Sequence, residues 1–106
     1  MVLEKFEYYD GKEKKGILLH KVHPYSLGLM LRKKDRKILF TLNKKRNVAF
    51  TSFFCRKFYM IILDENKKVT DKIYFSRWIW RYNCYGKYFI EILGKLDESS
   101  SKYRKI

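Results

Sequence analysis

An aromatic and basic stretch over residues 77–85 is the best candidate for chemistry in this sequence. It holds Trp78 and Trp80 between Arg77 and Arg81, with further aromatic residues after them. Proteins hold single-stranded nucleic acid by setting positive charge along the phosphate backbone and aromatic rings against the bases. If these rings are exposed, the sequence predicts salt-dependent binding of RNA or DNA. The alternative is a strand or loop that buries both tryptophans in the core and leaves the arginines in solvent.

A second group of cations, Lys44, Lys45 and Arg46, lies in a polar segment that has the composition and length of a hairpin turn. At the tip of a hairpin these three side chains are candidates for contacts with phosphate groups. The alternative is an ordinary solvated turn. The same two interpretations apply to the cations that precede it, which are Lys33, Lys34, Arg36 and Lys37.

Arg32 and Glu91 are candidates for a structural ion pair. Glu91 stands between Ile90 and Ile92, so strand alternation places its side chain on the opposite face from both. A carboxylate buried on such a face needs a partner, and Arg32 is a candidate for that role. The competing interpretation is a small-ligand or enzymatic pocket near Arg32, Glu91 and residues 52–56. We favour the structural pair over catalysis.

No residues at recognisable spacing indicate a metal site or a known type of active site. His20 and His23 are separated by the geometry of a strand that ends at Pro24, and no Cys-x-x-Cys accompanies them. Asp64 and Asp71 flank a turn and are interpreted as turn and rim residues. Glycine-rich phosphate loops, nucleophile elbows and zinc-protease motifs are absent from the sequence. We therefore predict no metal and no cofactor, and we lean away from an enzyme.

The net charge of the 106-residue chain is +14, which gives long-range attraction to a polyanion but can equally reflect the codon bias of an AT-rich genome. Two long stretches contain no acidic residue, one between Asp35 and Asp64 and the other from Lys72 to Tyr88. If the two stretches meet on one face, that face has a strongly positive potential. Their cations include Arg36, Lys37, Lys44, Lys45, Arg46, Arg56, Lys57, Lys72, Arg77, Arg81 and Lys87.

Length and composition predict one globular domain over residues 1–96 and a flexible tail over residues 97–106. The longest apolar runs, such as residues 58–63, are too short to cross a bilayer. The first residues lack the order of a signal peptide, so we expect a cytoplasmic protein with no membrane partner. In that compartment Cys55 and Cys84 are expected to be buried thiols.

Short apolar segments separated by turn residues predict a mainly β fold, as an antiparallel sandwich or a partly open barrel. Asp10 and Gly11 mark a tight hairpin between the first two segments. Leu27, Met30 and Leu31 follow Pro24 at helical spacing and predict one short helix near residues 24–33. The predicted strands cover residues 2–9, 17–22, 38–42, 48–54, 58–63, 69–78 and 88–93.

Five landmarks in a fixed order resemble the small prokaryotic family called domain of unknown function 192. They are the Gly-Leu-Met-Leu-Arg of residues 28–32, Leu-Phe at 39–40, Ser-Phe-Phe at 52–54, the Leu-Asp to Val segment at 63–69, and Ile-Glu-Ile-Leu-Gly at 90–94. The chain departs from that family at residues 55–57, where Cys-Arg-Lys replaces a Met-Lys-Asn-Thr segment. The resemblance implies a compact, mostly β fold with a short helix, retains both Arg32 and Glu91, and implies no known activity.

Three functions remain open at this point. The first is non-enzymatic binding of a polyanion such as RNA or DNA, which an exposed positive face with protruding Trp78 or Trp80 would favour. The second is a small-ligand or enzymatic domain, which a concave pocket with convergent polar groups and a perturbed acid would favour. The third is a protein-interaction domain, which a flat apolar patch would favour.

Overall fold

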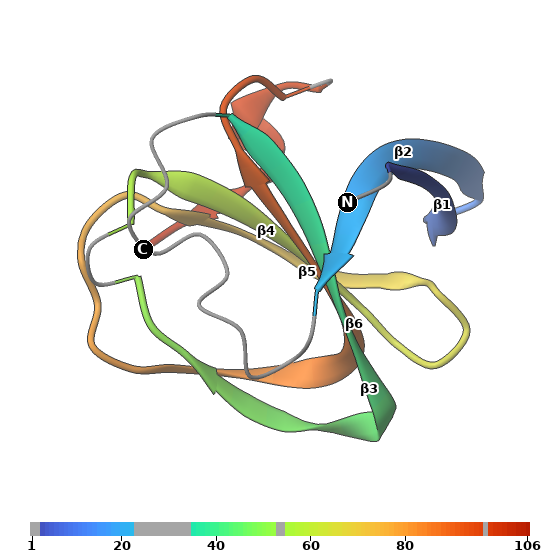
Figure 1. Cartoon of the computed structure of the whole chain (residues 1–106), viewed down its shortest axis with the longest axis horizontal. Coiled ribbons are helices and arrows are strands. Elements are labelled where there is room, and N and C mark those ends of the chain that lie inside the picture. The colour runs from blue at the N-terminus through green and yellow to red at the C-terminus, as the bar shows by residue number, and fades with distance from the viewer. Residues whose placement is uncertain (1–2, 23–34, 53–54, 97) are drawn as a thin grey trace.

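The computed structural model describes residues 3–22, 35–52, 55–96 and 98–106 of the chain. Seven strands form one sheet in the order β1-β2-β3-β6-β4-β5-β7, curled into a half-barrel (Figure 1). The predicted mainly β fold, in its partly open barrel form, is confirmed. The strands are β1 (Glu4–Asp10), β2 (Glu13–Val22), β3 (Arg36–Phe50), β4 (Phe58–Leu63), β5 (Val69–Phe75), β6 (Tyr82–Leu93) and β7 (Arg104–Lys105).

The sheet is mixed rather than wholly antiparallel. Most neighbouring strands are antiparallel, but β2 pairs with β3, and β5 with β7, in parallel. The described residues contain one 3₁₀ turn, η1 (Ser100–Lys102), and no α-helix. The helix predicted near residues 24–33 lies outside the described residues. Within the described ranges, no helix is long and apolar enough to cross a membrane.

The predicted hairpin at Asp10 and Gly11 is confirmed. Asp10 of β1 pairs with Glu13 of β2, so only two residues connect the strands. Gly11 adopts a φ of +66°, which a residue with a side chain rarely adopts and which a two-residue hairpin turn requires. The turn therefore sets the register of the whole β1–β2 hairpin.

Strand β3 corrects the prediction of two strands joined by a turn at residues 43–47. One continuous strand pairs along its whole length with β6, first through residues 36–41 and then through residues 46–50. Thr41 faces Tyr88 and Arg46 faces Gly86, so four residues of β3 lie opposite the single residue Lys87. This wide bulge bends β3 sharply at its corner in Figure 1, and bending of this kind is what a bulge does to a strand. The polar residues that resemble a turn therefore curl the sheet.

Gly86 allows β6 to pass close to β4 at the same corner. A Cβ atom at this position would lie 2.6 Å from the Ile62 Cγ2 atom and 3.0 Å from the Leu63 carbonyl oxygen. Both distances are shorter than van der Waals contact, so only glycine fits without displacing the neighbouring strand. The bulge in β3 and the glycine in β6 together form the corner of the half-barrel.

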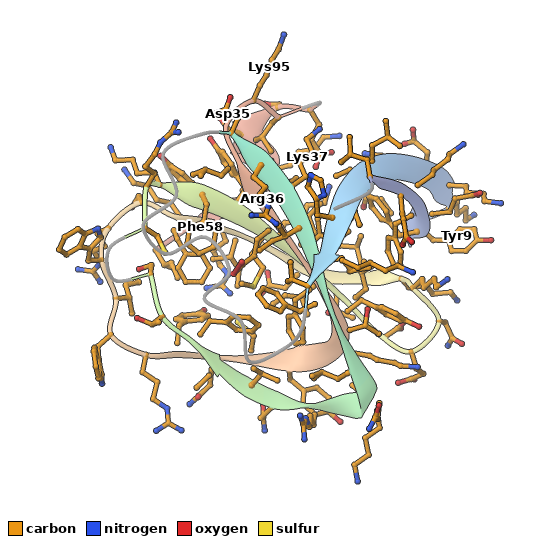
Figure 2. The ribbon with its side chains drawn as sticks, in the orientation of Figure 1. Tyr9, Asp35, Arg36, Lys37, Phe58 and Lys95 are labelled. Atoms are coloured by element: carbon orange, nitrogen blue, oxygen red, sulfur yellow. The ribbon has the colours of Figure 1, made fainter. Side chains whose placement is uncertain are left out.

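The two faces of the sheet carry separate hydrophobic clusters, because side chains alternate along each strand. Ile38 and Phe40 belong to the first cluster, whereas Leu39 between them belongs to the second. The residues of β4 divide between the two clusters, which confirms the prediction that this strand is buried on both faces. Phe58 points into the space that the curled sheet encloses (Figure 2). The β1–β2 hairpin adds Phe6, Tyr8, Ile17 and Leu19 to the second cluster.

The C-terminal segment differs from the flexible tail that the sequence predicts from residue 97. Residues 98–106 form η1 and then β7, which pairs with β5. Tyr103 is buried, at 7% exposure, and packs in the second cluster. The Ser76 amide also donates to the Ile106 carbonyl oxygen. Long-range partners on β5 thus order a segment whose own composition is typical of a loose end.

Candidate functional site

The aromatic and basic stretch begins as a loop, residues 76–81, that connects β5 to β6. Its two tryptophans are exposed, Trp78 by 57% and Trp80 by 74%. Arg77 and Arg81, which flank them, are exposed as well. The alternative in which both tryptophans belong to the core is therefore wrong. Residues 82–87, which gave no periodic signal, form the first half of β6.

A single buried residue, Ser52, fixes the shape of this loop. The Ser52 hydroxyl donates to the Arg77 carbonyl oxygen at 2.8 Å and accepts from the Ile79 amide at 2.7 Å. The Ser52 amide also donates to the Ile79 carbonyl oxygen at 3.0 Å, and the Ile79 side chain packs against the first cluster. The side chain between the two tryptophans thus points inward, and both rings are held outside. We call residues 76–81 the clamped loop.

The ring of Trp78 has a further restraint. Its Nε1 atom donates to the Cys55 carbonyl oxygen at 3.0 Å. This hydrogen bond fixes one edge of the indole and leaves more than half of the side chain in solvent. A ring held in this way presents its surface without losing the side-chain entropy that a mobile ring loses on binding.

The two acid-free stretches meet at the clamped loop, as the charge argument requires. Residues 46–50 of β3 pair with residues 82–86 of β6, and Ser52 bonds to Ile79. Lys57 is exposed beside this junction, and Arg56 lies there with its guanidinium 3.4 Å from the Asp35 carboxylate. Lys72 lies in an ion network elsewhere, and Arg36 and Lys37 line a separate pocket at the start of β3. The surface around the loop is therefore built from two stretches that contain cations and no acids.

A small recess of about 120 Å³ lies under Trp78. Ser52, Cys55 and Phe75 are buried at its floor, and Arg56, Lys57 and Arg77 are exposed at its rim. Ser76 completes its lining. The pocket region predicted near residues 52–56 contributes part of this lining, but no sequence pattern indicated that residues 75–78 complete it.

Lys44 and Lys45 lie in the bulge of β3, and Arg46 pairs with Gly86 directly after it, so none of the three is at the tip of a hairpin and the predicted setting is corrected. Lys44 and Arg46 are exposed. Lys45 is half-buried, with its Nζ atom 5.3 Å from the centre of the Tyr85 ring and 3.6 Å from the Glu65 carboxylate. The charge of Lys45 is thus partly compensated within the chain, whereas those of Lys44 and Arg46 face solvent.

Glu91 is a buried carboxylate in the middle of the sheet. It is 5% exposed and lies opposite Ile38 of β3 and Met60 of β4. Ile90 and Ile92 lie in the cluster on the other face, which confirms the predicted alternation. Its Oε2 atom accepts no hydrogen bond from the described residues, and burial raises its pKa to about 8. Arg32 lies outside the described residues, so the ion pair stays a prediction.

The two cysteines are free and buried, which confirms the predicted thiols. Burial raises the pKa of Cys55 to about 11 and that of Cys84 to about 12, with nearby carboxylates adding to the effect. Both groups are therefore protonated at neutral pH and are poor nucleophiles. In the described part of the chain, no three His, Cys, Asp or Glu side chains gather where they would hold a metal ion.

A wider pocket of about 390 Å³ opens where β2 meets the start of β3. Asp35, Arg36, Lys37 and Lys95 contribute to its lining, together with Leu3, Leu18, His20 and Leu93. Figure 2 shows Arg36 and Lys37 projecting from opposite sides of β3 and Lys95 pointing away from the sheet. Among the described residues that line this pocket, these charged side chains diverge, whereas a small-ligand or enzymatic site needs polar groups that converge.

An ion network that no sequence pattern indicates joins the β1–β2 hairpin to β5 and the C-terminal segment. The Lys72 ammonium contacts the carboxylates of Asp10 and Glu98, the latter at 2.7 Å. Lys15 contacts the same two carboxylates, at 3.3 and 2.9 Å. Burial alone would raise the pKa of Glu98, but hydrogen bonds from Lys72, Lys15 and Tyr103 outweigh it and hold that pKa at about 2. We call Asp10, Lys15, Lys72 and Glu98 the closed network.

Comparison with protein-family models, with curated proteins and with solved structures finds no match to this chain. The resemblance to the domain of unknown function 192 family therefore stays a prediction from the sequence, and so do the residues it pairs.

Proposed function

We propose that this chain is a non-enzymatic module that binds single-stranded RNA or DNA through the clamped loop and the adjoining residues 55–57. The observation that carries the proposal is the exposure of Trp78 and Trp80 on a loop whose backbone is fixed by the buried Ser52. Exposed indoles flanked by arginines are what single-strand binding uses, because every base has a face that stacks on an aromatic ring.

The binding mechanism divides the two tasks between two kinds of side chain. Trp78 and Trp80 stack on bases, which is worth about 1–3 kcal/mol for each base in proteins of this kind. Lys57, Arg77 and Arg81 contact the phosphates between those bases. The net charge of +14 attracts the strand over a longer range and raises the rate of encounter.

Two sets of buried groups favour binding over catalysis, whereas Glu91, with its pKa raised to about 8, is the perturbed acid that the enzymatic alternative would use. The thiols of Cys55 and Cys84 stay protonated, since burial raises the pKa of each to about 11 and about 12. The cations and carboxylates of the closed network satisfy one another. Neither set of groups is poised to exchange a proton with a substrate near neutral pH.

The test is a fluorescence-anisotropy titration with labelled single strands of about twelve nucleotides, an RNA and a DNA, and with the matching duplexes. We expect the single strands to bind more tightly than the duplexes, because paired bases cannot stack on the loop. Three phosphate contacts predict that log K falls with log salt with a slope of about −2.

The matched variants are Trp78→Ala with Trp80→Ala, and Tyr9→Ala as the control. Tyr9 is 40% exposed on β1, distant in sequence from the loop and labelled at the far side of the molecule in Figure 2. We expect the double variant to lose binding and the control to retain it. Equal affinity for single strands in both variants, or no binding to any strand at low salt, would refute the proposal.

A further inference from the structure

The recess under Trp78 has the size of a single small anion. Its volume is about 120 Å³. Pockets that hold whole small molecules are larger, on the order of 300–1,000 Å³. A nucleoside therefore does not fit, whereas a phosphate group does.

The charges at the rim favour an anion. Arg56, Lys57 and Arg77 surround the opening, and no acidic side chain is among the described residues that line it. Arg56 also contacts Asp35, so its charge is partly compensated. Lys57 and Arg77 come from the two acid-free stretches, one from each, and thus bring their charges to a common point.

Buried residues close the inner end of the recess. Ser52, Cys55 and Phe75 are 2%, 9% and 1% exposed, so a group that enters meets buried protein and does not pass through. A phosphate in the middle of a strand has a nucleotide on each side and needs room for both. A terminal phosphate is attached to one nucleotide only and needs room for that nucleotide alone. The exposed indole of Trp78, at the rim of the recess, offers a surface on which its base can stack.

We infer that the recess binds the terminal phosphate monoester of a single-stranded nucleic acid whose end base stacks on Trp78. The inference rests on the proposed function and deepens it from binding along a strand to recognition of its end. A monoester has a second pKa of about 6 and so carries almost two negative charges at neutral pH, against one for each internal phosphate. The cationic rim therefore favours the end group over any internal one.

The experiment compares one oligonucleotide in three forms, with a phosphate at its 5′ end, with a phosphate at its 3′ end, and with hydroxyls at both. We expect one phosphorylated form to bind about tenfold more tightly than the hydroxyl form, and which one it is assigns the polarity of the strand. The preference should decline when the pH is lowered below about 6, because the monoester then loses one charge.

Arg77→Ala and Lys57→Ala test the position, and Arg81→Ala is the matched control. Arg77 and Lys57 line the recess, whereas Arg81 lies beyond it at the other end of the clamped loop. We expect each recess variant to reduce the preference for the phosphorylated form, and the control to weaken all three forms by a similar factor. All three side chains are exposed, and a circular dichroism spectrum with a thermal melt checks that each variant is folded.

The outcomes separate the two proposals. Equal affinity of the wild-type protein for the three forms overturns the terminal-phosphate inference and leaves single-strand binding in place. A preference that survives in both recess variants also overturns it, because the end group then binds elsewhere. Failure to bind any of the three forms refutes the proposed function and the inference with it.

Discussion

The clamped loop and the closed network use similar residues for opposite purposes. In the closed network, Lys72 and Lys15 meet Asp10 and Glu98, and the Lys72 side chain is only 9% exposed. At the clamped loop, Arg77 and Arg81 are exposed in a stretch of sequence that contains no acid from Lys72 to Tyr88. Charges that are compensated inside the chain stabilise its fold, whereas charges left without local acids are available to an outside partner. This comparison tells which cations of a strongly basic chain to test first.

Removal of Lys72 should have the largest effect on stability. In Lys72→Ala, the carboxylates of Asp10 and Glu98 lose a partner while they stay partly buried, so we expect the free energy of unfolding to fall by about 3 kcal/mol. Urea denaturation measures this change. The control is Lys14→Ala, since Lys14 pairs with Glu7 in full solvent and its loss should leave stability unchanged within error. Similar losses in the two variants would contradict the distinction between buried and exposed pairs.

Glu91 gives a third case to compare, because it is a buried carboxylate that belongs neither to the clamped loop nor to the closed network. Its pKa is raised to about 8 when folded, so the folded protein holds a proton that the unfolded chain releases above its ordinary pKa of about 4.5. Stability therefore falls as pH rises between these two values, by about 1.4 kcal/mol per pH unit at most. Glu91→Gln should remove this decline, which unfolding curves at pH 6 and about pH 8 detect.

The same variant tests the predicted partner of Glu91. If Arg32 pairs with this carboxylate, Glu91→Gln leaves a buried cation alone and destabilises the protein at every pH. A stability that rises in the variant at high pH would instead refute the pair.

Replacement of Trp80 should weaken binding and leave folding alone. Trp80 is 74% exposed, so Trp80→Ala removes a stacking surface without opening a cavity. We expect binding of single strands to weaken by about 2 kcal/mol, which is roughly thirtyfold, with no change in the unfolding midpoint. Trp80→Tyr keeps an aromatic face and should retain most of the affinity. If Trp80→Ala lost stability and kept its affinity for single strands, Trp80 would serve the fold and not binding, contrary to this prediction.

Ser52 connects folding to binding, and its replacement should weaken both by a modest amount. Ser52→Ala removes both hydrogen bonds of the hydroxyl and leaves the Ile79 amide without that acceptor, at a cost of about 1–2 kcal/mol. Affinity should decline as well, because the tryptophans are no longer held in place. Thr51→Ala is the graded comparison, since the exposed Thr51 hydroxyl donates to the Ile79 carbonyl oxygen at 3.2 Å and the loss of this exposed bond should cost less. Unchanged affinity in Ser52→Ala would show that the clamp is not needed for binding.

Local signals in the sequence predicted the elements that depend on local chemistry. The Asp10–Gly11 turn and the apolar strand at residues 58–63 both form as expected. The hairpin turn predicted at residues 43–47 was wrong because their polar composition suits a turn and a bulge equally well. Only the pairing of both halves of β3 with β6 decides between the two, and that pairing is set by residues more than thirty positions away.

The candidate site was only partly predictable for the same reason. The residue types at positions 77–81 indicated nucleic-acid binding, but a tryptophan is more often buried than exposed, and composition cannot decide which applies. Whether the two tryptophans are exposed depends on Ser52, which lies 27 positions from Ile79 in sequence and holds that residue inward. Residues 52–56 were a candidate pocket region, but the other half of the recess and the whole closed network had no signal in the sequence, since their members converge only after the sheet has curled.

The placement of both tryptophans of the chain on one loop has a spectroscopic consequence. The hydrophobic clusters consist of aliphatic, phenylalanine, tyrosine and cysteine side chains, so indole emission originates at the surface alone. Emission excited selectively at the indoles should therefore be red-shifted in the native protein and quenched by added iodide. The molecule contains its own optical reporter of what touches the loop, while circular dichroism follows the sheet independently.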